Sequence, residues 1–522
     1  MYETSTTARG TPHPPVPVLS AAQSAMADAA AIAAGTPSLE LMERAGAAAT
    51  HVILQRFRPL LAEGVRILAG PGNNGGDGWV VGRLLAQEGV SVAIEPTGES
   101  RTAEARTMRD RAAGCLTSGP LDGARVVVDA LLGTGSRGGP RGAIADAVRS
   151  LVSARRAGAN IVALDVPTGL DATTGEATLI APAACTITFG SVKRGQLLAR
   201  HLIGELVAVD IGLGEPVGTG VLAELVTAEW VRRVVPAIAP DAHKGTRGKL
   251  AIVGGAEGMV GACILAARAA LRSGVGMVRV LVQPASLQAV QAAVPAALAG
   301  TWPGSDDEAA ELVEWADGLL IGPGLGRHAG ARGLVERVLA AGGCPVTLDA
   351  DGLNVFEGEG MALGRLLGGR VALLTPHAAE AGRLADAPVA EVLARRFEIA
   401  GELAEKTQAG VLLKGVPTVI AGVDGRTMVS ARGTAALATG GSGDVLAGIA
   451  ATLLLQMRDA PSAGACAAFV HGRAAEIADW SGVARGVDLD DVIAALGAAW
   501  RDWPAPAAPP VLAELPALGV AR

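Results

Sequence analysis

The chain of 522 residues has few aromatic side chains and little basic charge. It contains one tyrosine and five phenylalanines, and its formal net charge is −7. Because nucleic-acid binding needs clustered basic residues and aromatic side chains on which bases stack, we expect no nucleic-acid partner. Half of the residues are hydrophobic, but no run reaches the roughly 18 apolar residues that a spanning helix needs. We therefore expect no membrane segment.

Cysteine is also scarce and widely spaced. The five cysteines are Cys115, Cys185, Cys263, Cys344 and Cys466, and no C-x-x-C pair occurs among them. This spacing is typical neither of a zinc site nor of a disulfide framework. We expect free thiols and a reducing cytoplasm.

Lysine and asparagine are rare in a chain that uses arginine by default. Only five of the 44 basic residues are lysines, and only four asparagines occur. A lysine or asparagine inside a glycine-rich motif is therefore a better candidate for a functional role than it would be in a chain rich in these residues. On this ground Asn73, Asn74, Lys193 and Lys414 are candidate site residues.

The length predicts two large domains. Continuous apolar strands alternate with amphipathic helices in both halves, which predicts an α/β fold with parallel sheets covered on both faces. We expect a disordered leader over residues 1–18, a first domain over 19–220, a second over 235–505 and a C-terminal tail over 506–522. A Gly/Pro-rich linker is expected at 214–220.

The first glycine-rich loop follows the apolar strand 65–69. It spans residues 70–78, with the sequence GPGNNGGDG, and leads into a helix. Strand, glycine loop and helix are typical of a nucleotide site. The loop is not a dinucleotide G-x-G-x-x-G motif, and no acidic residue ends the next strand, 90–94. A solvent-facing turn is the alternative, but nine consecutive residues without a packing role favour binding.

Two further strands of this half end in polar residues. Strand 126–132 carries Asp129 and leads into the loop 133–139, and strand 161–164 ends at Asp165. In open α/β sheets, ligands bind outside the carboxyl ends of the strands. One such aspartate could be a helix cap, but three glycine-flanked strand ends indicate a crevice.

The second half is organised around Gly440-Gly441-Ser442-Gly443-Asp444, which precedes an apolar helix. A glycine turn at a helix N-terminus directs free N–H groups toward an anion such as phosphate. Asp444, in the first helical turn, would be placed as a base for a hydroxyl that attacks this phosphate. Helix capping by Asp444 is the alternative.

Other strand ends of this half carry glycine or polar residues as well. They are the segments 322–326, 348–354 and 412–415, and Thr375-Pro376-His377 with Glu380. His377 is the one histidine at such a strand end, although it could also act as a helix cap.

The first half, roughly residues 19–215, resembles the epimerase domain of the NAD(P)H-hydrate repair proteins, which has a Rossmann-like fold. The matching segments are 41–46, 70–78, 165–171, Asp129 with 133–135, and Phe189 with Lys193. The resemblance implies a potassium ion near Asn74, Asp129 and Thr168, where the family usually has serine at the last position. It implies that hydrated nicotinamide nucleotide contacts Asn73, Asn74, Gly75, Gly76, Asp77, Gly133, Thr134, Gly135, Ser136, Arg137, Gly138, Gly139 and Asp165.

The second half, roughly 240–500, resembles the ADP-dependent dehydratase of the same repair system, which has a ribokinase-like fold. The family's Asn-containing motif before the glycines is replaced here by residues 433–439. The resemblance implies ADP as co-substrate with a magnesium ion. It places substrate on Ala262, Gly324, Gly326, His377 and Asp444. It places the adenine nucleotide on Lys414, Gly415, Val416, Pro417, Thr418, Gly440, Gly441, Ser442 and Gly443.

Together the two halves predict a bifunctional enzyme. The first would interconvert the R and S forms of hydrated NADH and NADPH, with Asp165 and Lys193 assisting reversible chemistry at C6. The second would dehydrate the S form at the expense of ADP, giving NAD(P)H, AMP and phosphate, with Asp444 as the base. We also expect a homo-oligomer.

The alternative is a ribokinase-like small-molecule kinase fused to a non-catalytic nucleotide-binding domain, because the same glycine turn serves kinases. A dinucleotide oxidoreductase is disfavoured by the missing fingerprint.

Overall fold

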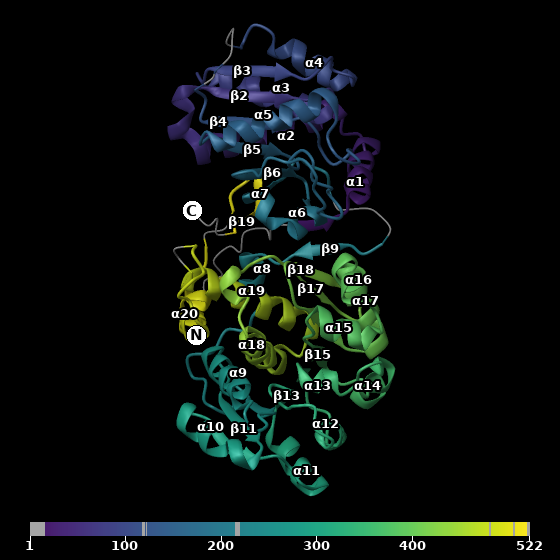
Figure 1. Ribbon diagram of the computed structural model, residues 1–522, viewed down its shortest axis with the longest axis vertical. Coiled ribbons are helices and arrows are strands. Elements are labelled where there is room, and N and C mark those ends of the chain that lie inside the picture. Colours follow the sequence, from purple (N-terminus) through teal and green to yellow (C-terminus); the bar gives the residue numbers. More distant parts are fainter. Residues whose placement is uncertain are drawn as a thin grey trace, which may run out of the picture. The chain divides into compact units, whose positions relative to one another are not determined.

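The computed structural model describes residues 16–116, 121, 123–214, 220–479, 482–504 and 507–518, and the chain divides into two compact units (Figure 1). Unit 1 comprises residues 1–220 and 507–517, and unit 2 comprises 221–506 and 518–522. Each unit contains a largely parallel sheet with helices against it, so the predicted α/β class is confirmed. Among the described residues, no helix is both long and apolar enough to span a bilayer.

The sheet of unit 1 has the strand order β19-β8-β6-β5-β4-β2-β3. All neighbours are parallel except β19, which runs antiparallel to β8. The strands are β2 (Val65–Ala69), β3 (Val92–Pro96), β4 (Val126–Ala130), β5 (Asn160–Leu164), β6 (Cys185–Phe189), β8 (Glu205–Val209) and β19 (Val511–Leu515). A separate parallel pair joins β1 (Val16–Leu19) to β7 (Val192–Lys193).

Helices cover both faces of this sheet. On one face, Val126 and Val128 pack with α2 and α3, while on the other Val127 packs with Val148 of α5. The helices are α1 (Ala21–Ala33), α2 (Ser38–Phe57), α3 (Asn73–Gln87), α4 (Ala103–Ala112), α5 (Gly142–Arg156), α6 (Arg194–Leu198) and α7 (Arg200–Ile203), with a 3₁₀ turn at Arg58–Glu63. Strand β2 lies between β3 and β4, where the strand order reverses, and this is where a crevice opens in doubly wound sheets.

The first glycine-rich loop differs from its prediction. Helix α3 begins at Asn73, so the loop's second half forms the first turns of the helix. A Cβ on Gly75 would lie 1.9 Å from the carbonyl oxygen of Gly70, and one on Gly78 would lie 2.6 Å from Cβ of Ala130. The interpretation that these residues lack a packing role is therefore wrong, because the glycines let the helix lie close to the strand ends.

The sheet of unit 2 is parallel from β12 to β16, after which β17 runs in the opposite direction to its two neighbours and β18 and β9 are parallel to each other. In order, its strands are β12 (Leu298–Thr301), β11 (Met277–Val282), β10 (Lys249–Val253), β13 (Gly318–Ile321), β14 (Val346–Leu348), β15 (Ala372–Leu374), β16 (Gly410–Leu413), β17 (Thr418–Ala421), β18 (Thr427–Ser430) and β9 (Ala223–Leu225). Strands β17 and β18 run antiparallel to their neighbours along the chain, and β9 pairs parallel with β18.

A layer of four helices packs together over this sheet: α9 (Val260–Arg272), α18 (Ser442–Met457), α19 (Ala460–Ala478) and α20 (Leu489–Arg501). The remaining helices are α8 (Ala228–Val234), α10 (Leu287–Ala293), α11 (Asp306–Trp315), α12 (Ala331–Ala340), α13 (Asp351–Asn354), α14 (Gly360–Leu367), α15 (Ala378–Ala385), α16 (Val389–Ala394) and α17 (Arg396–Thr407), with short 3₁₀ turns at Pro284–Ser286 and Ala435–Leu437. Helix α18 is buried on nearly all sides, which explains its almost continuous apolar sequence.

The ends of the chain depart from the predicted boundaries. Residues 16–18 of the expected leader belong to β1, and residues 511–515 of the expected tail form β19. Their apolar side chains are buried, Val18 and Leu515 among them, which a disordered segment does not do. Residues 221–234 contribute β9 and α8 to unit 2, ahead of the expected start at 235. Residues 1–15, and 215–219 of the predicted linker, lie outside the described residues.

We predict that Leu515→Ala lowers the free energy of unfolding of unit 1 by about 2–5 kcal/mol, because Leu515 is 3% exposed and its truncation leaves a cavity beside β8. Hydrogen exchange of the β8 amides should speed up accordingly. The matched control is Glu514→Ala on the same strand. It removes only a partly exposed ion pair to Arg56, worth about 0–1 kcal/mol. Equal protection of β8 in the two variants would contradict this role of β19.

Candidate functional site

The candidate site of unit 1 is built around a buried ion pair. Asp165 directly follows β5, and its Oδ1 lies 2.6 Å from Nζ of Lys193, whose side chain is 1% exposed. The ammonium also donates to Oγ1 of Thr188 at 2.8 Å and to the carbonyl of Phe189 at 3.0 Å. Because a buried charge is costly unless it is paired, this network fixes both charged groups in place.

The backbone at Asp165 is also unusual. Its φ of 63° lies in the left-handed region, which non-glycine residues seldom adopt and which often marks a functional position. The turn lets Oδ2 accept a hydrogen bond from the backbone N–H of Thr134 at 3.0 Å. Gln196 holds the turn, because its Nε2 donates to the carbonyl of Asp165 at 2.6 Å. The hydrogen bond from Thr134 thereby holds the loop 133–139 beside Asp165.

The three residues predicted to hold potassium lie at the same edge of the sheet. Oγ1 of Thr168 donates to Oδ1 of Asp129 at 2.7 Å, and the N–H of Thr168 donates to Oδ2 at 2.8 Å. Asn74 is 7% exposed, and neither its Oδ1 nor its Nδ2 has a hydrogen-bond partner among the described residues. A buried amide oxygen without a partner is unfavourable unless a ligand satisfies it, so this donor set fits a hard cation.

Asp77 and Asp28 add two carboxyl groups to this region. Burial raises the pKa of Asp77 well above its ordinary value, and the negative charges of Asp165 and Asp28 raise it further. Burial also raises the pKa of Asp28, which lies on α1 within electrostatic reach of Lys193 and Asp165. Asp77 was a predicted site residue, whereas Asp28 was missed because it lies in an alanine-rich helix without a motif.

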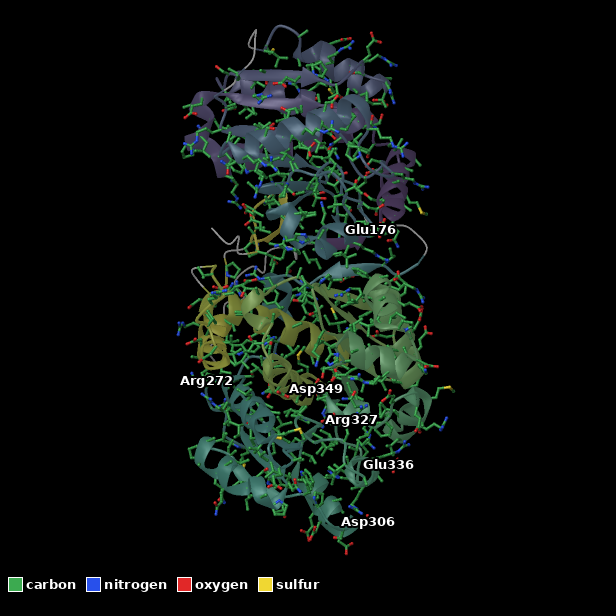
Figure 2. All side chains as sticks on the ribbon, in the orientation of Figure 1. Glu176, Arg272, Asp306, Arg327, Glu336 and Asp349 are labelled. Atoms are coloured by element: carbon green, nitrogen blue, oxygen red, sulfur yellow. The ribbon has the colours of Figure 1, made fainter. Side chains whose placement is uncertain are left out.

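The candidate site of unit 2 contains a second buried Asp–Lys pair. Nζ of Lys414, after β16, lies 2.7 Å from Oδ1 of Asp349, after β14. The side chain of Asp349, labelled in Figure 2, is 2% exposed and also accepts from Oγ1 of Thr375 at 2.8 Å. Glu380 lies 3.7 Å from the same ammonium. Although burial opposes it, the charges of Asp349 and Glu380 raise the pKa of Lys414.

Asp444 faces this pair from the first turn of α18, where the sequence predicted it. Gly441 precedes the helix with a left-handed φ of 96°, and a Cβ on Gly443 would lie 3.2 Å from Nζ of Lys414. Burial and, after it, the negative charge of Asp349 raise the pKa of Asp444 to about 7, against the opposing effect of the positive charge of Lys414. No hydrogen bond found among the described residues involves its carboxylate. Asp444 therefore does not cap the helix, and it titrates near neutrality.

The other residues predicted for substrate border the same edge. A Cβ on Gly324 would lie 3.2 Å from Cβ of Ala262, and the N–H of Gly326 donates to Asp351 at 2.9 Å. His377 is the N-cap of α15, which is the alternative role that the sequence also allowed for it. Its Nδ1 accepts from two backbone N–H groups, while Nε2 lies 3.4 Å from Glu380.

The segments predicted for the adenine nucleotide lie on two elements. Residues 414–417 connect β16 to β17, Thr418 begins β17, and Val416 is 61% exposed within this connection. Arg396 supports the turn by donating to the carbonyl of Pro417 at 2.6 Å. Gly440 and Gly441 precede α18, and Ser442 and Gly443 begin it. Lys414 and Gly443 are thus neighbours, so the two segments meet near Asp444.

His471 is a residue of this region that the sequence did not single out. It lies on α19, and burial together with the nearby positive charge of Lys414 lowers its pKa to about 4. Its Nε2 is buried and has no hydrogen-bond partner among the described residues. Nothing in the sequence around it marks this position.

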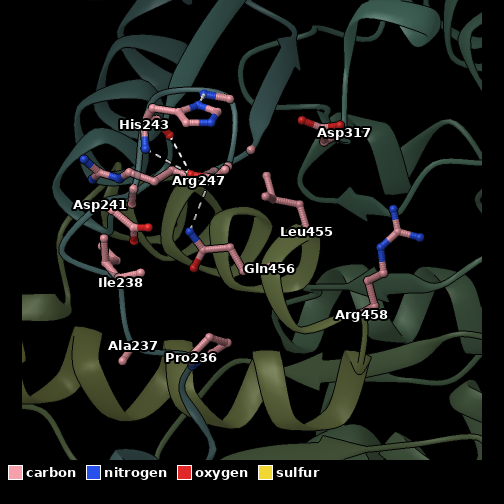
Figure 3. Close-up of a pocket in the computed structure, with 15 residues that line it drawn as sticks. Pro236, Ala237, Ile238, Asp241, His243, Arg247, Asp317, Leu455, Gln456 and Arg458 are labelled. Atoms are coloured by element: carbon pink, nitrogen blue, oxygen red, sulfur yellow. Dashed lines mark hydrogen bonds between the residues drawn. The ribbon is translucent and has the colours of Figure 1, made fainter. Parts of the chain in front are cut away.

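Unit 2 also has a cleft of about 570 Å³ away from these residues (Figure 3). It lies before the amino ends of β10 and β13 and beside the end of α18. Two of its polar side chains are already hydrogen-bonded to backbone: Arg247 donates to the carbonyl of Gly274 at 2.9 Å, and Gln456 donates to the carbonyl of Arg247 at 3.4 Å. Because ligands of such sheets bind at the carboxyl ends of the strands, this cleft is not the candidate site.

Two family models match the chain. The one described as "YjeF-related protein N-terminus" matches residues 38–195, and the one described as "NAD(P)H-hydrate dehydratase" matches residues 250–496. Among solved structures, the ADP/ATP-dependent NAD(P)H-hydrate dehydratase of Bacillus subtilis, co-crystallised with ATP/Mg²⁺, is 32% identical with a TM-score of 0.46. That similarity covers 53% of this chain and 97% of the other.

Two curated relatives match over most of their length. The bifunctional NAD(P)H-hydrate repair enzyme Nnr of Coxiella burnetii is 34% identical over 475 residues, covering 88% of this chain and 95% of that protein. The enzyme of the same name from Salinibacter ruber is 38% identical over 510 residues, covering 88% and 92%. Each of these matches extends over both halves of this chain. The chain belongs to the family of bifunctional NAD(P)H-hydrate repair enzymes.

Proposed function

We propose that this chain repairs hydrated NADH and NADPH through two activities. Unit 1 interconverts the R and S hydrates, and unit 2 converts the S hydrate and ADP into NAD(P)H, AMP and phosphate. The observation that carries the proposal is Asp444, a half-buried carboxylate with a pKa of about 7 beside a glycine turn and a lysine. Membership of the repair-enzyme family disfavours the alternative of a kinase fused to an idle domain.

In the proposed dehydration, Asp444 takes the proton of the C6 hydroxyl of the hydrate. The hydroxyl oxygen attacks the β-phosphorus of ADP, the bond between this phosphorus and the bridging oxygen breaks, and AMP leaves. The N–H groups of the glycine turn stabilise the charge on the transferring phosphoryl group. The ring nitrogen then expels phosphate from C6, and loss of the C5 proton restores the C5–C6 double bond.

Lys414 would face the phosphates of ADP while staying paired with Asp349. Magnesium is commonly held by nucleotide phosphates with one or two protein carboxylates. Asp349 and Glu380, the carboxylates beside Lys414, are suited to hold this magnesium ion, whose positive charge would offset the negative charge of the phosphates. Ala262, Gly324, Gly326 and His377 would border the hydrate itself.

In the proposed epimerisation, Asp165 exchanges protons with the hydrate while Lys193 holds its carboxylate in place. Reversible loss of the hydroxyl group at C6, or reversible ring opening at C6, interconverts the two configurations of this carbon. Neither step needs a phosphoryl donor. The glycine-rich segments 73–77 and 133–139 would bind the nucleotide. Asn74, Asp129 and Thr168 would hold a potassium ion, whose charge would favour an anionic group of the substrate.

We further propose that the enzyme acts as a homo-oligomer in the cytoplasm. The five cysteines are unpaired, and Cys185, Cys263 and Cys466 are buried. Buried free thiols suit a reducing compartment.

Asp444→Asn is predicted to abolish dehydration, because the amide cannot accept the hydroxyl proton. ADP affinity, measured by calorimetry, should change by less than about tenfold, or about 1.4 kcal/mol. Asp424→Asn, at an exposed ion pair of the same unit, serves as the control and should keep full turnover. Turnover by Asp444→Asn above a tenth of the control rate would remove Asp444 from the role of base.

The pKa of Asp444 should respond in opposite directions to two neighbouring substitutions. Asp349→Asn removes a negative charge and should lower this pKa below about 7, whereas Lys414→Met removes a positive charge and should raise it. Since the base must be ionised, dehydration by the wild type should slow as pH falls through about 7. Carboxyl-carbon NMR titration, with Asp444→Asn for assignment, measures the pKa. Shifts of the same sign in both variants would contradict this electrostatic arrangement.

Asp165→Ala is predicted to stop epimerisation in the full-length chain. With ADP present, this variant should consume the S hydrate and then proceed only as fast as the hydrates exchange spontaneously. Because the substitution leaves Lys193 buried and unpaired, at a cost of about 3–5 kcal/mol, Asp165→Asn is the conservative second variant. Chromatographic separation of the epimers over time is the measurement. Consumption of both epimers at the wild-type rate would show that Asp165 is dispensable.

A further inference from the structure

Unit 1 has a cleft of about 610 Å³ beside the proposed hydrate-binding loops. It is lined by the connection after β3, by the start of α5 and by Pro71 of the first glycine-rich loop. Its charged side chains are Arg101, Arg106, Arg141 and Glu99, so the lining carries an excess of two positive charges on a chain whose net charge is −7. The cleft is therefore a local basic site on an acidic protein.

The cleft is physically joined to the first loop. The N–H of Arg101 donates to the carbonyl of Pro71 at 2.7 Å, and the N–H of Thr97 donates to the carbonyl of Ala69 at 2.9 Å. On the other side, Arg141 lies two residues after Gly139, where the loop 133–139 ends. Whatever binds in the cleft thus lies next to both loops that would hold the hydrated nicotinamide nucleotide.

The arginines of the cleft have different roles. The guanidinium of Arg106, on α4, donates to the carbonyls of Arg101 at 2.8 Å and Ser100 at 3.2 Å, which fixes the connection. The guanidinium groups of Arg101 and Arg141 make no hydrogen bond or ion pair among the described residues. They therefore remain available for a ligand, and guanidinium groups recognise phosphate particularly well.

We propose that Arg101 and Arg141 form a subsite for a phosphate group of the dinucleotide substrate in unit 1. The inference rests on the proposed epimerase function and extends it from the reacting ring to the rest of the substrate. The connection after β3 follows the first strand–loop–helix segment. In dinucleotide-binding sheets, this is the place where arginine accommodates the 2′-phosphate of NADP-type cofactors. The pyrophosphate is the other phosphate group that could enter, and the test separates the two.

The test uses full-length Arg101→Ala/Arg141→Ala without ADP, so that only epimerisation is measured. The KM for hydrated NADPH should rise at least about tenfold. The control is Arg109→Ala/Arg156→Ala, which removes the same charge from α4 and α5 outside the cleft. A KM change for hydrated NADPH alone assigns the 2′-phosphate, and an equal change for hydrated NADH assigns the pyrophosphate. A KM equal to that of the control for both hydrates overturns the subsite.

Hydrogen exchange gives a readout that is independent of turnover. Adding hydrated NADPH should protect the amides of residues 97–101 in the wild type and in the control, but not in the double variant. Protection without any epimerisation would overturn the proposed activity and leave the subsite in place. Equal protection in the double variant, or none in the wild type, would overturn the subsite.

Discussion

A buried aspartate–lysine pair at the carboxyl end of the strands anchors the candidate site of each unit. Asp165 lies 2.6 Å from Lys193 in unit 1, and Asp349 lies 2.7 Å from Lys414 in unit 2. Removing charged groups from water costs several kcal/mol per ion, and only close pairing with further hydrogen bonds offsets that cost. Neither aspartate can move without exposing its partner to the same cost. The positions of the surrounding loops follow from this restraint.

The two pairs differ in whether the paired aspartate itself is the proposed reacting group. In unit 1 the paired carboxylate is itself the proposed proton-exchanging group. In unit 2 the charges of the pair act on a third group, Asp444, which is the proposed base. Burial and the charge of Asp349 bring the pKa of Asp444 to about 7. A left-handed residue lies at or next to each paired aspartate: Asp165 itself, with φ of 63°, and Ala350, with φ of 49°. Such strained backbone is typical of sites where side-chain direction matters.

Much of this arrangement could be predicted from the sequence because it depends on local patterns. Apolar runs bounded by glycine located the parallel strands. A strand end indicated Asp165, the glycine turn before an apolar helix indicated Asp444, and the rarity of lysine with the family resemblance indicated Lys193. The onset of α3 at Asn73 was missed, because a run of glycines is locally unfavourable to a helix and only close packing against Gly70 explains it.

Other features depend on contacts between distant segments. Strand β19 is separated from its partner β8 by the whole of unit 2, and its five residues carry no motif. The pairing of Lys414 with Asp349 joins residues 65 positions apart. The sequence indicated Lys414 as a site residue and 348–354 as a strand end, but it could not show that the two side chains bond. Asp28 and His471 are identified only by their neighbours in space. Each of these features follows from the tertiary fold and not from spacing along the chain.

The most direct test of the central claim is the stoichiometry of the complete reaction. The intact chain is mixed with a known mixture of R and S hydrates of NADH and an excess of ADP. NADH recovery is followed by absorbance, and AMP and phosphate are quantified by chromatography. Both epimers should be consumed, with one AMP and one phosphate formed for each NADH recovered. A stable phosphorylated product without NADH recovery, or NADH recovery without AMP, would contradict it.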